Sequence, residues 1–158
     1  MSGSLSERLA GAGAVVLGGI FFLAMILLPV LLIVGGIRVA EVALPWMFPV
    51  CALIFWLDVL VLLPLAIFPA TRIWAGVGLI WSSYAFGATA WFMGLLTTWI
   101  LWGGVAVVVG LFILGVGVVP IGLLALLVNG EWGAFGLLLG AIVLTFATRA
   151  GGAALGEA

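Results

Sequence analysis

The sequence contains no histidine and no lysine, and Cys51 is its single cysteine. Histidine and cysteine are the usual protein ligands of zinc, haem iron and iron–sulfur clusters, so we expect no such cofactor. A Ser/His or Cys/His catalytic pair is excluded for the same reason. Because a lone cysteine cannot form an intrachain disulfide, we interpret Cys51 as a small helix-packing residue, with a reactive or intermolecular thiol as the alternative.

Charged residues are also scarce: the 158 residues include four arginines and five carboxylates, and the net charge is −1. The absence of any basic patch argues against nucleic-acid binding. Four of the carboxylates lie outside the apolar stretches or at their edges, so no pair is placed for acid–base catalysis. These four are Glu7, Glu41, Glu131 and Glu157. We therefore expect a protein that is not an enzyme.

Apolar residues dominate the chain, at 68% of the sequence with a mean hydropathy of +1.59. This composition is typical of integral membrane proteins and predicts an all-α, polytopic helical transmembrane bundle forming one domain over residues 1–158. A span needs about 20 apolar residues to cross about 30 Å of hydrocarbon. Five stretches are predicted as spans, at about 9–37, 46–68, 73–97, 105–128 and 132–148. We expect a plasma or inner membrane location.

The connections between these spans are predicted to be short. Residues 38–44 carry two charges and are expected to link the first two spans, and Gly103 and Gly104 mark the turn between the third and fourth. The fifth stretch is at the lower length limit, so a re-entrant or interfacial segment is its alternative, followed by a flexible tail from Arg149. With five spans the arginines divide equally between the two sides, so orientation does not follow.

Asp58 lies near the middle of the second predicted span. A carboxyl at that depth costs several kcal/mol unless it is paired, hydrogen-bonded or protonated, so it is a candidate functional site. The alternative is a satisfied, protonated residue that joins two helices. Counting outward from about residue 71 in the following tight turn places Asp58 level with Tyr84. We therefore predict a hydrogen bond from Asp58 to Ser83, with Tyr84 as the second choice.

The third predicted span has two distinct faces at helical spacing. Small residues line one face, which we expect to pack closely against another helix. Aromatic residues line another face, which is expected to meet lipid, a partner subunit or a cavity. The small face comprises Gly76, Ser83, Gly87, Ala90 and Gly94, and the aromatic face comprises Trp74, Trp81, Tyr84 and Trp91.

Two functions from different classes fit these observations. The first is a non-enzymatic subunit of a membrane assembly, surrounded by membrane lipid and forming either a homo-oligomer or part of a larger membrane complex. The second is a small ion or proton channel or transporter that uses Asp58. Its polar lining would come from the hydroxyls of Ser82, Ser83, Tyr84, Thr97 and Thr98.

Overall fold

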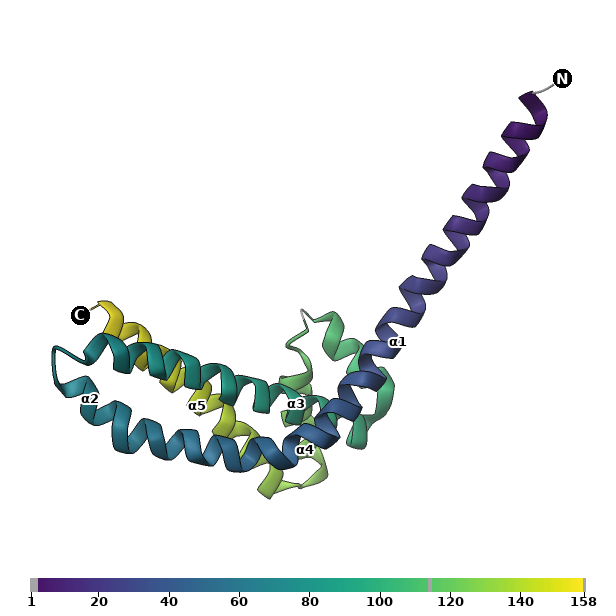
Figure 1. Ribbon diagram of the computed structural model, residues 1–158. Coiled ribbons are helices and arrows are strands. Elements are labelled where there is room, and N and C mark those ends of the chain that lie inside the picture. The colour runs from purple at the N-terminus through teal and green to yellow at the C-terminus, as the bar shows by residue number, and fades with distance from the viewer. Residues whose placement is uncertain (1–2, 114, 158) are drawn as a thin grey trace. The chain divides into compact units, whose positions relative to one another are not determined.

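The structure is a computed structural model that describes residues 3–113 and 115–157, without the side chains of residues 3–15, 24–26, 28, 29, 32 and 157. The described residues are almost entirely helical and contain no strand (Figure 1). The elements in order are α1 (Gly3–Leu57), the π-helix η1 (Asp58–Leu62), α2 (Leu63–Ile67), α3 (Arg72–Phe112), α4 (Val118–Asn129) and α5 (Trp132–Glu157).

The chain divides into two units, residues 1–35 and residues 36–158. The first unit contributes the beginning of α1, and its described side chains from Val16 to Leu23 are exposed and, apart from two glycines, apolar. The second unit is a helical bundle and contains every contact discussed below.

Three helical segments are long and apolar enough to cross a membrane: Ile33–Ile67, Arg72–Phe112 and Trp132–Gly156. This result supports membrane association. The helix α4 has 12 residues, which correspond to about 18 Å at about 1.5 Å per residue and are too few to cross the hydrocarbon core. The count of five spans therefore stays a prediction.

Residues 38–44, which the sequence predicts as a connection, lie within α1 and are helical. The helix also continues through Pro45 and Pro49. A proline removes one backbone hydrogen bond, and membrane helices tolerate this loss where neighbouring groups or local changes in helix geometry satisfy the freed carbonyl. The two charges that suggested a connection form an ion pair one turn apart, with Arg38 Nη1 3.3 Å from Glu41 Oε2.

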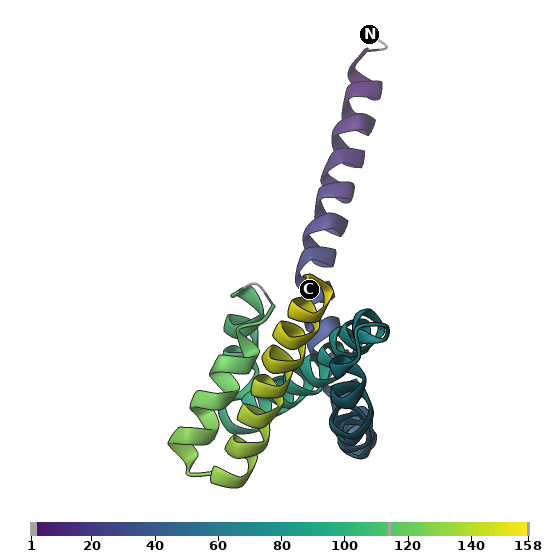
Figure 2. The ribbon, with the colours of Figure 1, turned by 90° about the vertical axis from the view of Figure 1, so that its left-hand side faces the viewer.

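The stretch 105–128, predicted as one span, is divided into two short helices. Helical geometry in α3 is interrupted at Gly103 (φ 77°, ψ −174°), so the predicted turn residues mark a change of chain direction. The chain then reverses between α3 and α4, where Gly115 also has a positive φ. We call Gly104–Asn129 the hairpin; its two limbs are the end of α3 and α4 (Figures 1 and 2).

The helix α5 is longer than the sequence predicts, because residues 149–157 continue it instead of forming a flexible tail. Glycine and alanine dominate this extension, and close contact with α3 compensates for their weak side-chain packing. A Cβ atom at Gly152 would lie 2.7 Å from the carbonyl oxygen of Gly76. At 26 residues α5 is long enough to span a membrane, which removes the length argument for a re-entrant fifth segment.

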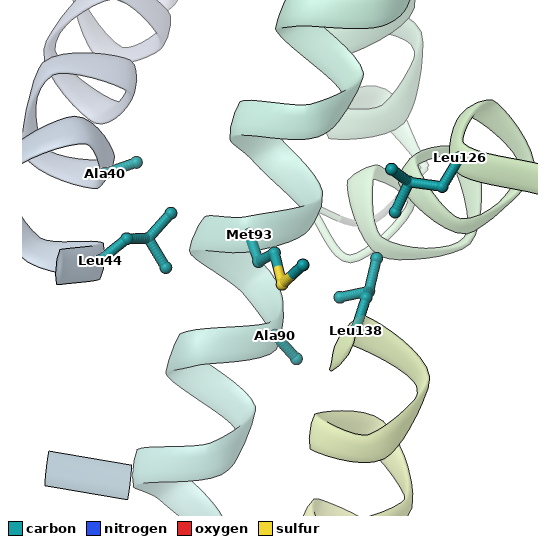
Figure 3. Close-up of a cluster of buried hydrophobic side chains, with 6 residues drawn as sticks. All are labelled: Ala40, Leu44, Ala90, Met93, Leu126 and Leu138. Atoms are coloured by element: carbon teal, nitrogen blue, oxygen red, sulfur yellow. The ribbon is translucent and has the colours of Figure 1, made fainter. Parts of the chain in front are cut away.

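Four helices meet at one cluster of buried apolar side chains (Figure 3). Its members are Ala40 and Leu44 of α1, Ala90 and Met93 of α3, Leu126 of α4 and Leu138 of α5. Figure 3 shows α3 in the middle of this group, with α1 on one side and α4 and α5 on the other. The helix α3 is therefore the central element of the bundle.

Candidate functional site

Asp58 is buried, with 4% of its surface exposed, at the contact between η1 and α3. The Ser82 hydroxyl donates a hydrogen bond of 2.7 Å to its Oδ1 atom. The second carboxyl oxygen, Oδ2, is buried without a hydrogen-bond partner in the structure. The Ser82 Oγ atom also lies 3.1 Å from the carbonyl oxygen of Gly78, so one hydroxyl hydrogen faces two acceptors. A single hydrogen bond therefore joins the carboxyl to α3.

The partner of Asp58 is Ser82, and the prediction of Ser83 is wrong by one residue. The Ser83 hydroxyl donates instead to the carbonyl oxygen of Ile80, at 2.6 Å. The prediction assumed uniform α-helical rise between Asp58 and the turn. The intervening π-helical turn holds more residues per turn than an α-helix, so Asp58 lies nearer the turn than the count assumes.

The π-helix at Asp58 has an identifiable local cause. Pro64 has no amide hydrogen and cannot complete the α-helical pattern. The Leu63 amide donates to the carbonyl oxygen of Asp58, five residues earlier, which is the π-helical pattern. Prolines and π-turns are both common causes of helix kinks, and here η1 is followed directly by α2, which contains Pro64.

The other hydroxyls proposed as polar lining do not gather around Asp58. Thr97 donates to the Met93 carbonyl oxygen at 2.7 Å, and Thr98 donates to that of Gly94 at 2.7 Å, both within α3. Such bonds satisfy a hydroxyl within its own helix. Tyr84 is exposed on the outside of the bundle, where the Arg149 guanidinium lies 5.7 Å from the centre of its ring.

The small face of α3 lies against α5 and α4. A Cβ atom at Gly76 would lie 2.9 Å from the Gly152 carbonyl oxygen, and one at Gly87 would lie 3.3 Å from Thr145 Cγ2. Further along, a Cβ atom at Gly94 would lie 2.9 Å from the Cα atom of Val119 in α4. The two remaining members, Ser83 and Ala90, are buried. The helices therefore approach one another at backbone distance along this face.

The aromatic face of α3 is divided. Trp74, Trp81 and Tyr84 are exposed, whereas Trp91 is half-buried. The indole Nε1 of Trp91 donates a hydrogen bond of 2.7 Å to the carbonyl oxygen of Gly115, at the turn of the hairpin. Trp91 thus attaches the hairpin to α3, and the three exposed side chains form an outward-facing surface.

A groove of about 310 Å³ lies between α1, α3 and α5, and we call it the α1–α5 groove. Sequence reasoning did not identify it. Its walls are mainly aromatic and aliphatic, and its polar atoms include Cys51 Sγ, which lies 3.0 Å from Thr89 Oγ1. The lining residues are Phe48, Cys51, Ala52, Phe55, Trp56, Phe86, Thr89, Gly136, Leu137, Gly140, Ala141 and Leu144.

The glycines of this groove have open space around them. A Cβ atom at Gly136 or Gly140 would meet no atom within 4 Å. The four-residue spacing of this pair was the available sequence signal, but spacing alone does not show whether a partner is present. Within the described part of the chain, no group of three or more His, Cys, Asp or Glu residues could hold a metal ion.

Comparison of the chain with protein-family models, with curated proteins and with solved structures finds no match. The class that the fold defines is a helical bundle with three candidate membrane-spanning helices.

Proposed function

We propose that this protein is a non-enzymatic subunit of a membrane assembly and that an apolar helix of a second chain packs into the α1–α5 groove. The observation that carries the proposal is the open space above Gly136 and Gly140 at a groove lined by aromatic side chains.

Other glycines of the chain lie in close contact with a neighbouring helix. At Gly76, Gly94 and Gly122 a Cβ atom would lie 2.9 Å from an atom of a neighbouring helix, so these glycines serve packing within the chain. Gly136 and Gly140 have the same four-residue spacing as small-residue pairs that bring membrane helices together, yet no atom of another helix in the described bundle lies within 4 Å of a Cβ atom at either.

Lipid supplies no hydrophobic driving force for helix association, because lipid tails are as apolar as leucine side chains. Association in a bilayer therefore depends on close van der Waals packing. A groove lined by glycines and by rigid aromatic side chains gives a partner helix many van der Waals contacts, and its side chains lose little conformational entropy on binding. Disordered lipid tails fill such a groove less completely than a helix does.

The experimental test is to fill the α1–α5 groove with larger side chains. We expect the double variant Gly136→Leu and Gly140→Leu to lose its partner chain, measured by native mass spectrometry of the protein extracted from its own membrane. Ala88→Leu is the matched control, because Ala88 is exposed on α3 and does not line the groove. We expect this control to keep the mass of the wild-type assembly, whether the partner is a second copy or another protein.

Three outcomes would overturn the proposal. One is a wild-type protein with the mass of a single chain, and a second is wild-type protein carrying lipid but no second chain. The third is an assembly that the double leucine variant leaves intact. Cys51 provides an independent readout, because it lines the groove and is the single cysteine. Its thiol should react with a maleimide more slowly in the assembly than in detergent-separated chains.

A second candidate function, proton or cation translocation through Asp58, is favoured by one observation. The Asp58 Oδ2 atom is buried without a hydrogen-bond partner, which is where a proton or cation would bind. The hydroxyls of Thr97 and Thr98 donate to backbone carbonyl oxygens of α3, so few hydroxyls remain to line a polar path for ions. Flux into proteoliposomes that falls in Asp58→Asn but not in Ser83→Ala would support this function, and equal flux in wild type and Asp58→Asn would exclude it.

A further inference from the structure

The hairpin Gly104–Asn129 lies in a stretch without charge, since no charged residue occurs between Arg72 and Glu131. Its first limb runs from Gly104 to Phe112 and is about 14 Å long, and α4 is about 18 Å long. The hydrocarbon core of a bilayer is about 30 Å thick. Neither limb can cross it.

The two limbs are antiparallel neighbours. A Cβ atom at Gly110 would lie 2.9 Å from Val118 Cγ1, and one at Gly117 would lie 2.5 Å from the Gly110 carbonyl oxygen. Because the limbs are joined by a reversal and lie against each other, the chain returns toward the level at which it left α3 (Figures 1 and 2).

Apart from Asn129 at its end, the exposed side chains of the described part of the hairpin are apolar. Large apolar side chains remain exposed on both limbs and at the turn, and a helix that is apolar all round is typical of a protein core or of lipid. These exposed side chains are Val105, Val108, Val109, Phe112, Ile113, Val116, Leu124, Leu127 and Val128. Water is therefore a poor solvent for this segment.

Four described amides at the turn find hydrogen-bond partners within the protein, as a location in lipid requires. The amides of Ile113, Gly115, Gly117 and Val119 all donate to carbonyl oxygens of the hairpin. Pro120 has no amide hydrogen, so its position in the first turn of α4 leaves one donor fewer to satisfy.

The turn is also attached to α3 by specific contacts. Trp91 Nε1 donates to the Gly115 carbonyl oxygen, and Thr98 Oγ1, whose one hydrogen also faces the Gly94 carbonyl oxygen, lies 3.1 Å from that of Val118. Trp91 and Thr98 lie within the part of α3 that precedes the break at Gly103. The turn thus lies beside the body of α3, away from the level where the hairpin begins.

We propose that Gly104–Asn129 is a re-entrant hairpin, which enters the membrane and leaves it on the same side. Trp102 and Glu131 then lie on one side, and the turn at Ala70 lies on the other. Among the arginines of the second unit, Arg72 and Arg149 then share a side, and Arg38 at the other end of the segment Ile33–Ile67 is outnumbered. Positively charged flanks face the cytoplasm, so the side with Ala70 is cytoplasmic.

Single-cysteine labelling tests this topology in intact cells with a membrane-impermeant maleimide. In a Cys51→Ala background, one cysteine is placed at Ala70, Trp102, Val116, Glu131 or Ala154. We expect labelling from outside at Trp102 and Glu131. We expect none at Ala70 and Ala154 until the membrane is opened, and none at Val116 even then, because the turn lies in lipid. Unfolding in detergent should expose all five, which controls for reactivity.

Each alternative gives a different pattern. If Trp102 and Glu131 label from opposite sides, the segment spans the membrane and the proposal is wrong. If Val116 labels as fast as Glu131, the hairpin lies at the surface and is not re-entrant. If Ala70 labels from outside while Trp102 and Glu131 do not, the hairpin returns as proposed but the orientation is reversed. The labelling does not depend on the groove, so its failure and that of the proposed function are distinguishable.

Discussion

Gly94 of α3 offers the sharpest prediction, because its surroundings are backbone and cannot move aside cheaply. A Cβ atom there would lie 2.9 Å from Val119 Cα and 3.1 Å from the Val118 carbonyl oxygen, whereas ordinary contacts begin at 3.4 Å. In Gly94→Ala the helices α3 and α4 must separate by several tenths of an ångström. Overpacking of this kind costs about 1–3 kcal/mol. The higher helix propensity of alanine relative to glycine stabilises α3 by about 0.5–1 kcal/mol and offsets part of this cost.

We therefore expect Gly94→Ala to lower the free energy of unfolding by about 1 kcal/mol, within a range of about 0–2.5 kcal/mol, in mixed micelles titrated with a denaturing detergent. The matched control is Gly136→Ala in α5, where the added atom has nothing within 4 Å. There only the propensity gain of about 0.5–1 kcal/mol remains. Equal effects of the two substitutions would refute the reasoning, because they would show that the contact between α3 and α4 does not limit the side chain at residue 94.

Two further predictions concern the hydrogen bonds between helices. A double-mutant cycle of Asp58→Leu and Ser82→Ala should give a coupling of about 0.6–1.7 kcal/mol, the range for such bonds in membrane helices, measured by the same unfolding titration; a coupling near zero would contradict the bond. Trp91→Phe removes the bond to the Gly115 carbonyl oxygen and should cost about 0.5–1.5 kcal/mol. It should also speed hydrogen exchange at the hairpin turn but not in α5, and unchanged exchange at the turn would show that Trp91 does not attach it.

The proposed partner site and the proposed re-entrant hairpin lie in different parts of the bundle. The groove is formed by α1, α3 and α5, whereas the hairpin is attached to α3 through Trp91 and Thr98. A variant that fills the groove should therefore leave the labelling pattern of the hairpin unchanged. Conversely, loosening the hairpin turn should leave the mass of the assembly unchanged.

Several features of the fold follow directly from the sequence. Composition alone predicts an all-helical chain with helices long and apolar enough to span a membrane, because no water-soluble core could bury so much apolar surface. The tight turn near residue 71 predicts that Asp58 lies level with the early part of α3. The glycine pair at 103 and 104 marks the break in α3.

The errors have equally specific causes. The charges at Arg38 and Glu41 suggest a loop, yet a helix accommodates both because residues three apart face each other. The one-residue error at Ser82 comes from a π-turn whose extra residue no apolar pattern records. Residues 149–157 look like a tail because they are small, but small residues permit the backbone contact with α3 that orders them.

By itself the sequence determined the apolar character of the segments and their helical structure, since hydropathy and helical spacing are properties of each segment alone. It also determined which residues share a face of α3. Only the tertiary structure decided what covers each face, because close packing depends on residues far apart in the chain. That is why the glycines of α3 are covered, why Gly136 and Gly140 are open, and why 105–128 turns back on itself instead of running straight through.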